Sequence, residues 1–185
     1  SSANRGACIQ NCRKTYTVTD KEDGHQFEID NEYIMSPKDL CTIGFLDQVL
    51  EAGANILKLE GRGRSPEYVK TTTECYRDAA DSYLKGTYTK EKIEKWITIL
   101  KTVYNRGFWD GYYLGQKLGE WSKTHGSKAT KKKMYLGKAK KYFTNLQVAE
   151  FDLESFSLNK GDNILITGKT TGVVETVVGE MRLND

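Results

Sequence analysis

Apolar residues recur three or four positions apart in three stretches, and this spacing predicts helices over residues 36–52, 65–84 and 89–104. A Ser-Pro pair opens each of the first two, with serine as the N-cap and proline as the first helical residue. Glycine follows both of these helices, as it follows many helix C-termini.

Runs of β-type residues alternate with the predicted helices. Two runs flank Asp23-Gly24 and predict a hairpin over residues 14–31. Residues 55–62 predict a strand between the first and second helices. The order strand, helix, strand, helix favours βαβ units around a parallel sheet, so residues 1–121 are expected to form an α/β domain.

The strand over residues 55–62 carries ionised side chains on one face, at Lys58, Glu60 and Arg62, and leucines on the other. Two interpretations fit this alternation. The strand is half exposed with one solvated face, or the ionic row points inward at the mouth of a barrel, where alternate residues line the interior. The alternation of charged and apolar residues does not decide between these two interpretations.

The last fifty residues lack helical periodicity. Their short β-type runs are separated by turn residues and predict a small closed or nearly closed β-barrel. Three segments follow: an α/β part over residues 1–121, a lysine-rich linker over residues 122–133, and a β domain over residues 134–185.

The composition is that of an ordinary globular protein, with 38% hydrophobic and 29% charged residues. No apolar run is long enough for a membrane span and no signal peptide opens the chain, so we expect a cytoplasmic protein without membrane contact. Residues 1–13 begin with Ser1 and resemble an interior segment, which suggests a fragment of a longer protein.

Lysines gather where acidic residues are missing, between Trp121 and Glu150. They form either a solvated linker or a phosphate-binding surface. The candidate phosphate-binding residues are Lys131, Lys132, Lys133, Lys138, Lys140 and Lys141.

Three cysteines, Cys8, Cys12 and Cys41, fall within 34 residues, whereas Cys75 stands alone on a predicted helix. Clustered thiols in an intracellular chain favour metal ligation over disulfides, yet the spacing matches no strong zinc template. Small buried hydrophobes are the alternative.

Machinery for peptide hydrolysis is not recognisable. The chain contains neither an HExxH motif nor a GxSxG elbow. Its histidines, His25 and His125, lie in a predicted hairpin and in the linker, without the setting of a catalytic base.

Four ordered blocks, "NRGACIQNCR", "YIMSPKDLC", "LKLEGRGRSPEYV" and "NRGFWDGYYLG", resemble the collagenase-like peptidase family, peptidase family U thirty-two. Some bacterial members of that family are tRNA and ribosomal RNA hydroxylation proteins. The resemblance covers the whole chain. It implies the C-terminal portion of a (β/α) barrel-like domain followed by a barrel similar to the second domain of elongation factor Tu.

In the hydroxylating members, the resemblance implies an iron-sulfur cluster. Two of its cysteines lie upstream of this segment, and the others match Cys8 and Cys41. Cys12 matches a frequent family cysteine and is a further candidate ligand. The ligand set within this chain would be incomplete.

The family fold favours an inward ionic row with Lys58, Glu60, Arg62 and Arg64 as catalytic candidates near the barrel mouth. The segment "EGRGR" departs from the family pattern, because Gly63 and Arg64 replace the commoner Met and Lys. Glu60 and Arg62 match the family pattern.

The function implied is hydroxylation at carbon 5 of a pyrimidine, a tRNA uridine above all, with prephenate as a metabolite partner. Expected partners are tRNA or rRNA, with the β domain as the docking module, and the missing N-terminal half of the same protein. The aromatic residues Phe108, Trp109, Tyr112 and Tyr113 either stack on an extruded base or pack against the barrel. The alternatives are a collagenase-like peptidase and a non-catalytic RNA-binding module, and this segment alone is expected to be inactive.

Overall fold

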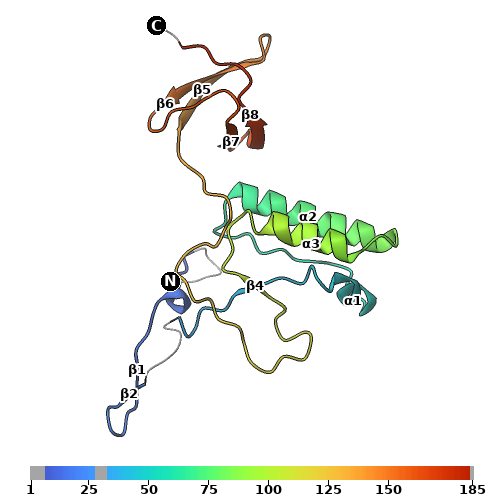
Figure 1. The fold of residues 1–185 in the computed structure, drawn as a ribbon, viewed down its shortest axis with the longest axis vertical. Helices are drawn as coiled ribbons and strands as arrows, with labels where there is room; N and C mark the ends of the chain where they lie inside the picture. Colours follow the sequence, from blue (N-terminus) through green and yellow to red (C-terminus); the bar gives the residue numbers. More distant parts are fainter. Residues whose placement is uncertain (1–6, 28–32, 184–185) are drawn as a thin grey trace. The chain divides into compact units, whose positions relative to one another are not determined.

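The chain divides into two compact units, Ser1–Lys131 and Lys132–Asp185, each of which is considered by itself. The computed structural model describes residues 7–27 and 33–183 (Figure 1).

A parallel strand pair and three helices build the first unit. Strand β3 (Asp39–Leu40) pairs in parallel with β4 (Phe108–Trp109). The chain between them contains α1 (Leu46–Glu51), α2 (Pro66–Leu84) and α3 (Lys90–Leu100). A crossover through helices is what a parallel pair requires. The first unit is therefore mixed α/β, and α2 and α3 lie side by side in it (Figure 1).

The core of this unit lies between the helices and the residues that follow β3. Ile43 and Leu46 have no exposed surface, and Trp96 is 2% exposed. The indole Nε1 of Trp96 donates a hydrogen bond of 2.8 Å to Asp78 Oδ2, so the ring is buried without an unpaired donor. The core thus joins all three helices to the segment after β3.

The second and third predicted helices are confirmed. Helix α2 begins at Pro66, and Gly86 follows its end with φ of +66°, the left-handed conformation favoured at that position. Helix α3 begins after Thr89, whose side chain accepts a hydrogen bond from Lys92 N, and it ends earlier than predicted, at Leu100.

The first predicted helix is wrong over its first half, because α1 begins only at Leu46. The Ser36-Pro37 pair leads into extended chain, with Pro37 bridged to Trp121 and β3 paired with β4. Ser36 Oγ caps no helix and accepts a hydrogen bond from Arg13 instead. Pairing with distant segments has overridden a local helix signal.

The strand predicted over residues 55–62 is also wrong, since the structure gives these residues no regular secondary structure. No strand among the described residues lies beside them to complete a ladder. Leu57 still packs against the core. The hairpin around Asp23-Gly24 is confirmed as β1 (Val18–Thr19) paired with β2 (Gln26–Phe27).

Two antiparallel hairpins form the second unit. Strand β5 (Gly137–Phe143) pairs with β6 (Val148–Leu153), and β7 (Asn163–Gly168) pairs with β8 (Gly172–Val177). A Cβ on Gly137 would lie 1.8 Å from Asp152 O, so only glycine fits this close approach of β5 and β6.

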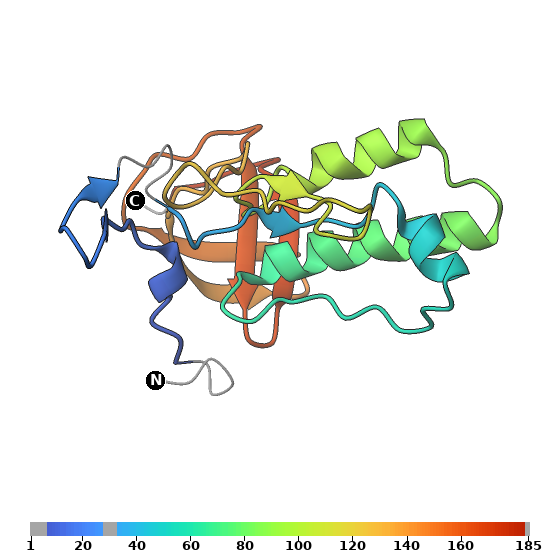
Figure 2. The ribbon, with the colours of Figure 1, turned by 90° about the horizontal axis from the view of Figure 1, so that it is seen from below.

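The predicted closed barrel is not confirmed. Among the described residues each sheet of the second unit stops at two strands, and the hairpins run in crossed directions (Figure 2). A closed barrel would pair every strand edge. Val178 is the one buried apolar side chain among those described in this unit.

The helical core predicts a sharp contrast between two leucines. We expect Leu46→Ala to lower the free energy of unfolding by about 2–5 kcal/mol, because a fully buried side chain leaves a cavity. Leu84→Ala is the matched control: Leu84 is 76% exposed, and its loss should change stability by about 0.5 kcal/mol or less. Urea denaturation of both variants measures the difference, and equal losses would contradict the described core.

Candidate functional site

The predicted ionic row does not converge on a described pocket. Lys58, Glu60 and Arg62 are all exposed. Glu60 Oε1 accepts a hydrogen bond of 2.7 Å from the backbone N–H of Arg62, so this carboxylate caps its own turn. Arg64 differs from these three residues, because its side chain is partly buried in the first unit.

Arg64 lies over an aromatic ring. Its guanidinium carbon is 3.9 Å from the ring centroid of Tyr104 and 5.6 Å from that of Tyr68. Guanidinium groups within about 6 Å of a ring face are attracted by the ring quadrupole. Arg64 is thereby held just before α2, and it is partly buried.

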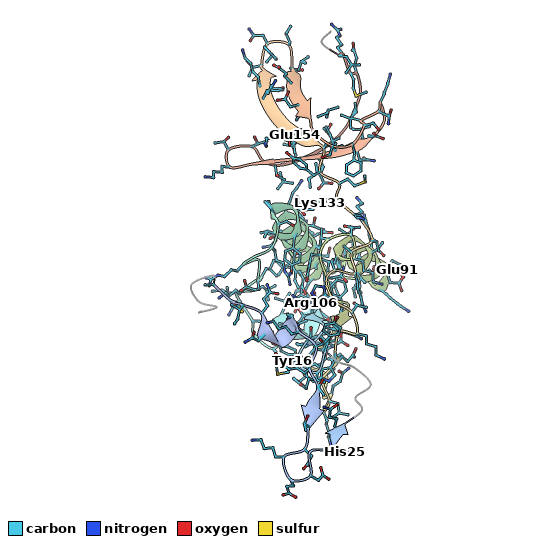
Figure 3. All side chains as sticks on the ribbon, turned by 90° about the vertical axis from the view of Figure 1, so that its left-hand side faces the viewer. Tyr16, His25, Glu91, Arg106, Lys133 and Glu154 are labelled. Carbon is cyan, nitrogen blue, oxygen red and sulfur yellow. The ribbon has the colours of Figure 1, made fainter. Side chains whose placement is uncertain are left out.

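Tyr104 also faces a second arginine, Arg106, whose guanidinium carbon is 5.4 Å from the same ring centroid. Arg106 is 7% exposed and lies within the first unit, whereas Glu91 on α3 points outward (Figure 3). Its Nη1 donates to Asp39 Oδ1 and its backbone N–H to Asp39 Oδ2, both at 2.8 Å. Both carboxylate oxygens of Asp39 thus accept hydrogen bonds from Arg106.

The third arginine, Arg13, is the last residue of the short 3-10 helix η2 (Asn11–Arg13). Its Nη1 donates to Ser36 Oγ and to Pro37 O, both at 3.0 Å. Burial and the nearby positive charge of Arg106 lower the pKa of Arg13, against the opposing effect of Asp39. We call Arg13, Arg64 and Arg106 the arginine cluster, in which Asp39 pairs with Arg106.

A cavity of about 350 Å³ adjoins the cluster at Arg13. We call it the basic pocket, and it is lined by Arg13, Lys14, Thr15, Tyr33 and His125. The rings of Tyr33 and His125 lie 6.5 Å apart between centroids and are tilted by 42°. Among the described residues, no Asp or Glu lines this pocket. Such a site favours an anionic ligand with a flat apolar part.

The cysteines separate into two environments. Cys8 and Cys12 are exposed, whereas Cys41 and Cys75 are buried. The hydroxyl of Tyr76 lies 2.9 Å from Thr42 N and 4.0 Å from Cys41 Sγ. Burial raises the pKa of Cys41, and it raises the pKa of Cys75 to about 11. Both buried thiols are therefore protonated at neutral pH.

The described cysteines do not by themselves form an iron-sulfur cluster site. Within residues 7–27 and 33–183, no three His, Cys, Asp or Glu side chains are placed to hold a metal ion. The chain supplies no complete ligand set in this arrangement.

The candidate RNA-binding lysines are partly engaged by acidic neighbours. Lys138 Nζ lies 3.2 Å from Glu154 Oε1, and Lys140 Nζ lies 2.7 Å from Asp152 Oδ1. Lys141 lies over the ring of Phe143, 4.7 Å from its centroid. The remaining candidates, Lys131, Lys132 and Lys133, are exposed before β5. Hairpin β5–β6 is thus closer to neutral than its lysines suggest.

The aromatic candidates differ in how far they are packed. Phe108 packs against the core, and Trp109 makes an edge contact with Tyr112 at 5.2 Å between centroids. Tyr113 contacts Phe45, yet Tyr112 and Tyr113 are 60% and 66% exposed. Packing explains Phe108, while the two tyrosines remain open to a ligand.

Sequence reasoning missed Arg13, Arg106 and Tyr104 as functional candidates. The available signals were the basic pair in "CRKTY" and the Tyr-x-Arg spacing in "YNRGFW". Neither pattern is specific to a functional site. No helix in the described part of the chain combines the length and apolarity of a membrane span.

Comparison with known proteins places the first unit in a defined family. The profile described as Peptidase family U32 matches residues 1–123. A collagenase of Porphyromonas gingivalis is 57% identical over 182 residues, which cover 98% of this chain and 44% of that protein. An uncharacterised protease of Methanocaldococcus jannaschii is 36% identical over 98% of this chain and 45% of its own length.

RNA-modifying proteins are among the relatives. A tRNA hydroxylation protein of Bacillus subtilis is 30% identical over 96% of this chain and 44% of its own length. The chain spans less than half the length of these relatives. No solved structure matches it.

The raised pKa of Cys75 predicts a pH dependence of stability. Because the folded state holds the thiol proton more tightly, its contribution is complete below the ordinary pKa of 9.0 and is lost as pH rises toward about 11. Between pH 8 and 10.5, we expect wild-type protein to lose on the order of 1 kcal/mol more stability than Cys75→Ala. Urea denaturation at both pH values measures this, and equal losses in the two proteins would refute the assignment.

Proposed function

Because the chain belongs to peptidase family U32, we propose that the intact protein containing it modifies RNA by hydroxylating a pyrimidine base. The arginine cluster carries this proposal. Arg106 pairs with Asp39, Arg64 and Arg106 both lie against the Tyr104 ring, and Arg13 lines a pocket whose described residues include no Asp or Glu. An RNA backbone is an anionic partner of this kind. The tRNA hydroxylation protein of Bacillus subtilis, which aligns over 96% of the chain, supports the same substrate class.

We propose tRNA or rRNA as the partner and carbon 5 of a pyrimidine, a tRNA uridine above all, as the position modified. Among the relatives, a 23S rRNA 5-hydroxycytidine synthase of Escherichia coli is 36% identical over 64% of this chain. An RNA substrate of this kind implies a cytoplasmic protein.

The oxygen chemistry would belong to a cofactor, since no described side chain can supply it. An iron-sulfur cluster in the intact protein stays a prediction, with Cys8 and Cys41 as ligands, Cys12 as a further candidate, and others from outside this chain. Prephenate stays a predicted partner whose carboxylates suit guanidinium groups. Catalytic roles for Lys58, Glu60 and Arg62 stay a prediction. These roles would require neighbouring groups from outside the described residues to complete the site.

Peptide hydrolysis is the second candidate, favoured by the 57% identical protein named a collagenase. Its chemistry requires an activated nucleophile or a metal-bound water. The described residues gather no metal-binding group, and Cys41 and Cys75 are buried with raised pKa values. A non-catalytic RNA-binding module is the third candidate, supported by the exposed lysines before β5.

Deletion of the gene for the intact protein should remove one hydroxylated pyrimidine from cellular tRNA or rRNA. Mass spectrometry of digested RNA would then show a nucleoside lighter by one oxygen atom. Wild-type protein should restore the modification and Cys8→Ala should not, with loss of iron and acid-labile sulfide from the purified variant. Cys8 is exposed, so this substitution leaves the core intact.

Cys75→Ala is the matched control, because Cys75 lies in the helical core and is not a predicted ligand. It should retain both iron and the modified nucleoside. An unchanged nucleoside profile after gene deletion, together with gelatin cleavage by rigorously purified protein, would replace the RNA proposal with the peptidase one.

A further inference from the structure

The basic pocket contains a cation held in a fixed orientation. Arg13 uses Nη1 for both of its hydrogen bonds, to Ser36 Oγ and Pro37 O. Ser36 is 3% exposed, and its carbonyl accepts a hydrogen bond of 2.7 Å from Ser122 N. The partners of Arg13 are therefore rigid. Its described hydrogen bonds leave Nη2 and Nε to a ligand in the pocket that Arg13 lines.

Lys14 and Thr15 continue the lining of the pocket beside Arg13. Lys14 is exposed and follows η2 in extended backbone, with φ of −93° and ψ of 160°. A guanidinium, an ammonium and a hydroxyl side by side are donors that suit phosphate oxygens. No Asp or Glu competes for them within the part of the lining that the structure describes.

Tyr33 and His125 add two rings to the same pocket, 6.5 Å apart between centroids. His125 is exposed and follows Thr124, whose carbonyl accepts a hydrogen bond of 3.1 Å from the Oγ of the fully buried Ser122. Ring faces next to phosphate-binding donors are the elements with which proteins bind single-stranded nucleotides, since every base has a π-face to stack. The volume of about 350 Å³ lies within the range of small-ligand sites, about 300–1,000 Å³.

We propose that the basic pocket binds one nucleotide of an RNA strand, with the phosphate against Arg13, Lys14 and Thr15 and the base against Tyr33 and His125. This inference rests on the proposed function for its substrate class, and it names the residues that receive the strand. Arg13 is positioned by its hydrogen bonds to Ser36 Oγ and Pro37 O.

Equilibrium binding of fluorescently labelled, unfractionated tRNA to the intact protein tests this assignment over a range of salt concentrations. Lys14→Gln should weaken binding roughly threefold to tenfold and reduce the slope of log affinity against log salt by about one. Lys95→Gln makes the same charge change on an exposed position of α3 and should alter neither quantity.

His125→Ala should weaken tRNA binding roughly tenfold, because a stacking surface is lost, and should leave the salt slope unchanged at pH 8. His25→Ala, in the turn of the β1–β2 hairpin, is the matched control and should bind as wild type does. Wild-type affinity and salt slope in both Lys14→Gln and His125→Ala would overturn the assignment. Displacement of tRNA by micromolar uridine monophosphate would also overturn it, in favour of a free-nucleotide site.

The two proposals fail separately. If the hydroxylated nucleoside is present in cells while Lys14→Gln and His125→Ala bind tRNA normally, the pocket assignment alone is wrong. If these variants lose tRNA binding while gene deletion leaves every hydroxylated nucleoside in place, the pocket assignment holds and the proposed reaction is wrong.

Discussion

The ion pair between Asp39 and Arg106 is the contact on which the rest of the first unit depends. Asp39 begins β3, Arg106 precedes β4, and two hydrogen bonds of 2.8 Å join them across 67 residues of chain. Arg106 is nearly buried, so its charge requires this partner. The pair fixes the start of the parallel ladder and, with it, the Tyr104 ring that Arg64 covers.

Charge is distributed differently in the two units, and this difference bears on function. In the first unit, Asp39 pairs with Arg106, and the described residues that line the pocket beside Arg13 include no Asp or Glu. In the second unit, Lys138 and Lys140 each meet an acidic side chain across the β5–β6 hairpin. Exposed pairs of this kind contribute little stability but reduce the charge available to a polyanion. The first unit is therefore the stronger candidate for contact with RNA, and the β hairpins are the weaker one.

Local sequence signals predicted local structure well. The Ser65-Pro66 start and Gly86 end of α2, and the turn at Asp23-Gly24, depend on neighbouring residues alone. The same logic failed at Ser36-Pro37, where pairing with β4 and with Trp121 overrides the helix signal. It failed again over residues 55–62, where no described strand completes a ladder. Arg64 was a candidate by position, but its stacking on Tyr104, and the contact of Arg106 with Asp39, depend on tertiary folding that spacing does not encode.

A double-mutant cycle between Asp39 and Arg106, followed by urea denaturation of the intact protein, tests the central claim most directly. The cycle compares Asp39→Ala, Arg106→Ala and the double variant, with the exposed pair Arg77 and Asp81 as a parallel cycle. We expect a coupling free energy of about 1–3 kcal/mol for the buried pair and about 0.5 kcal/mol or less for the exposed one. Equal and near-zero coupling in the two cycles would contradict the account, because β3, β4 and the arginine cluster would then be held together by something else.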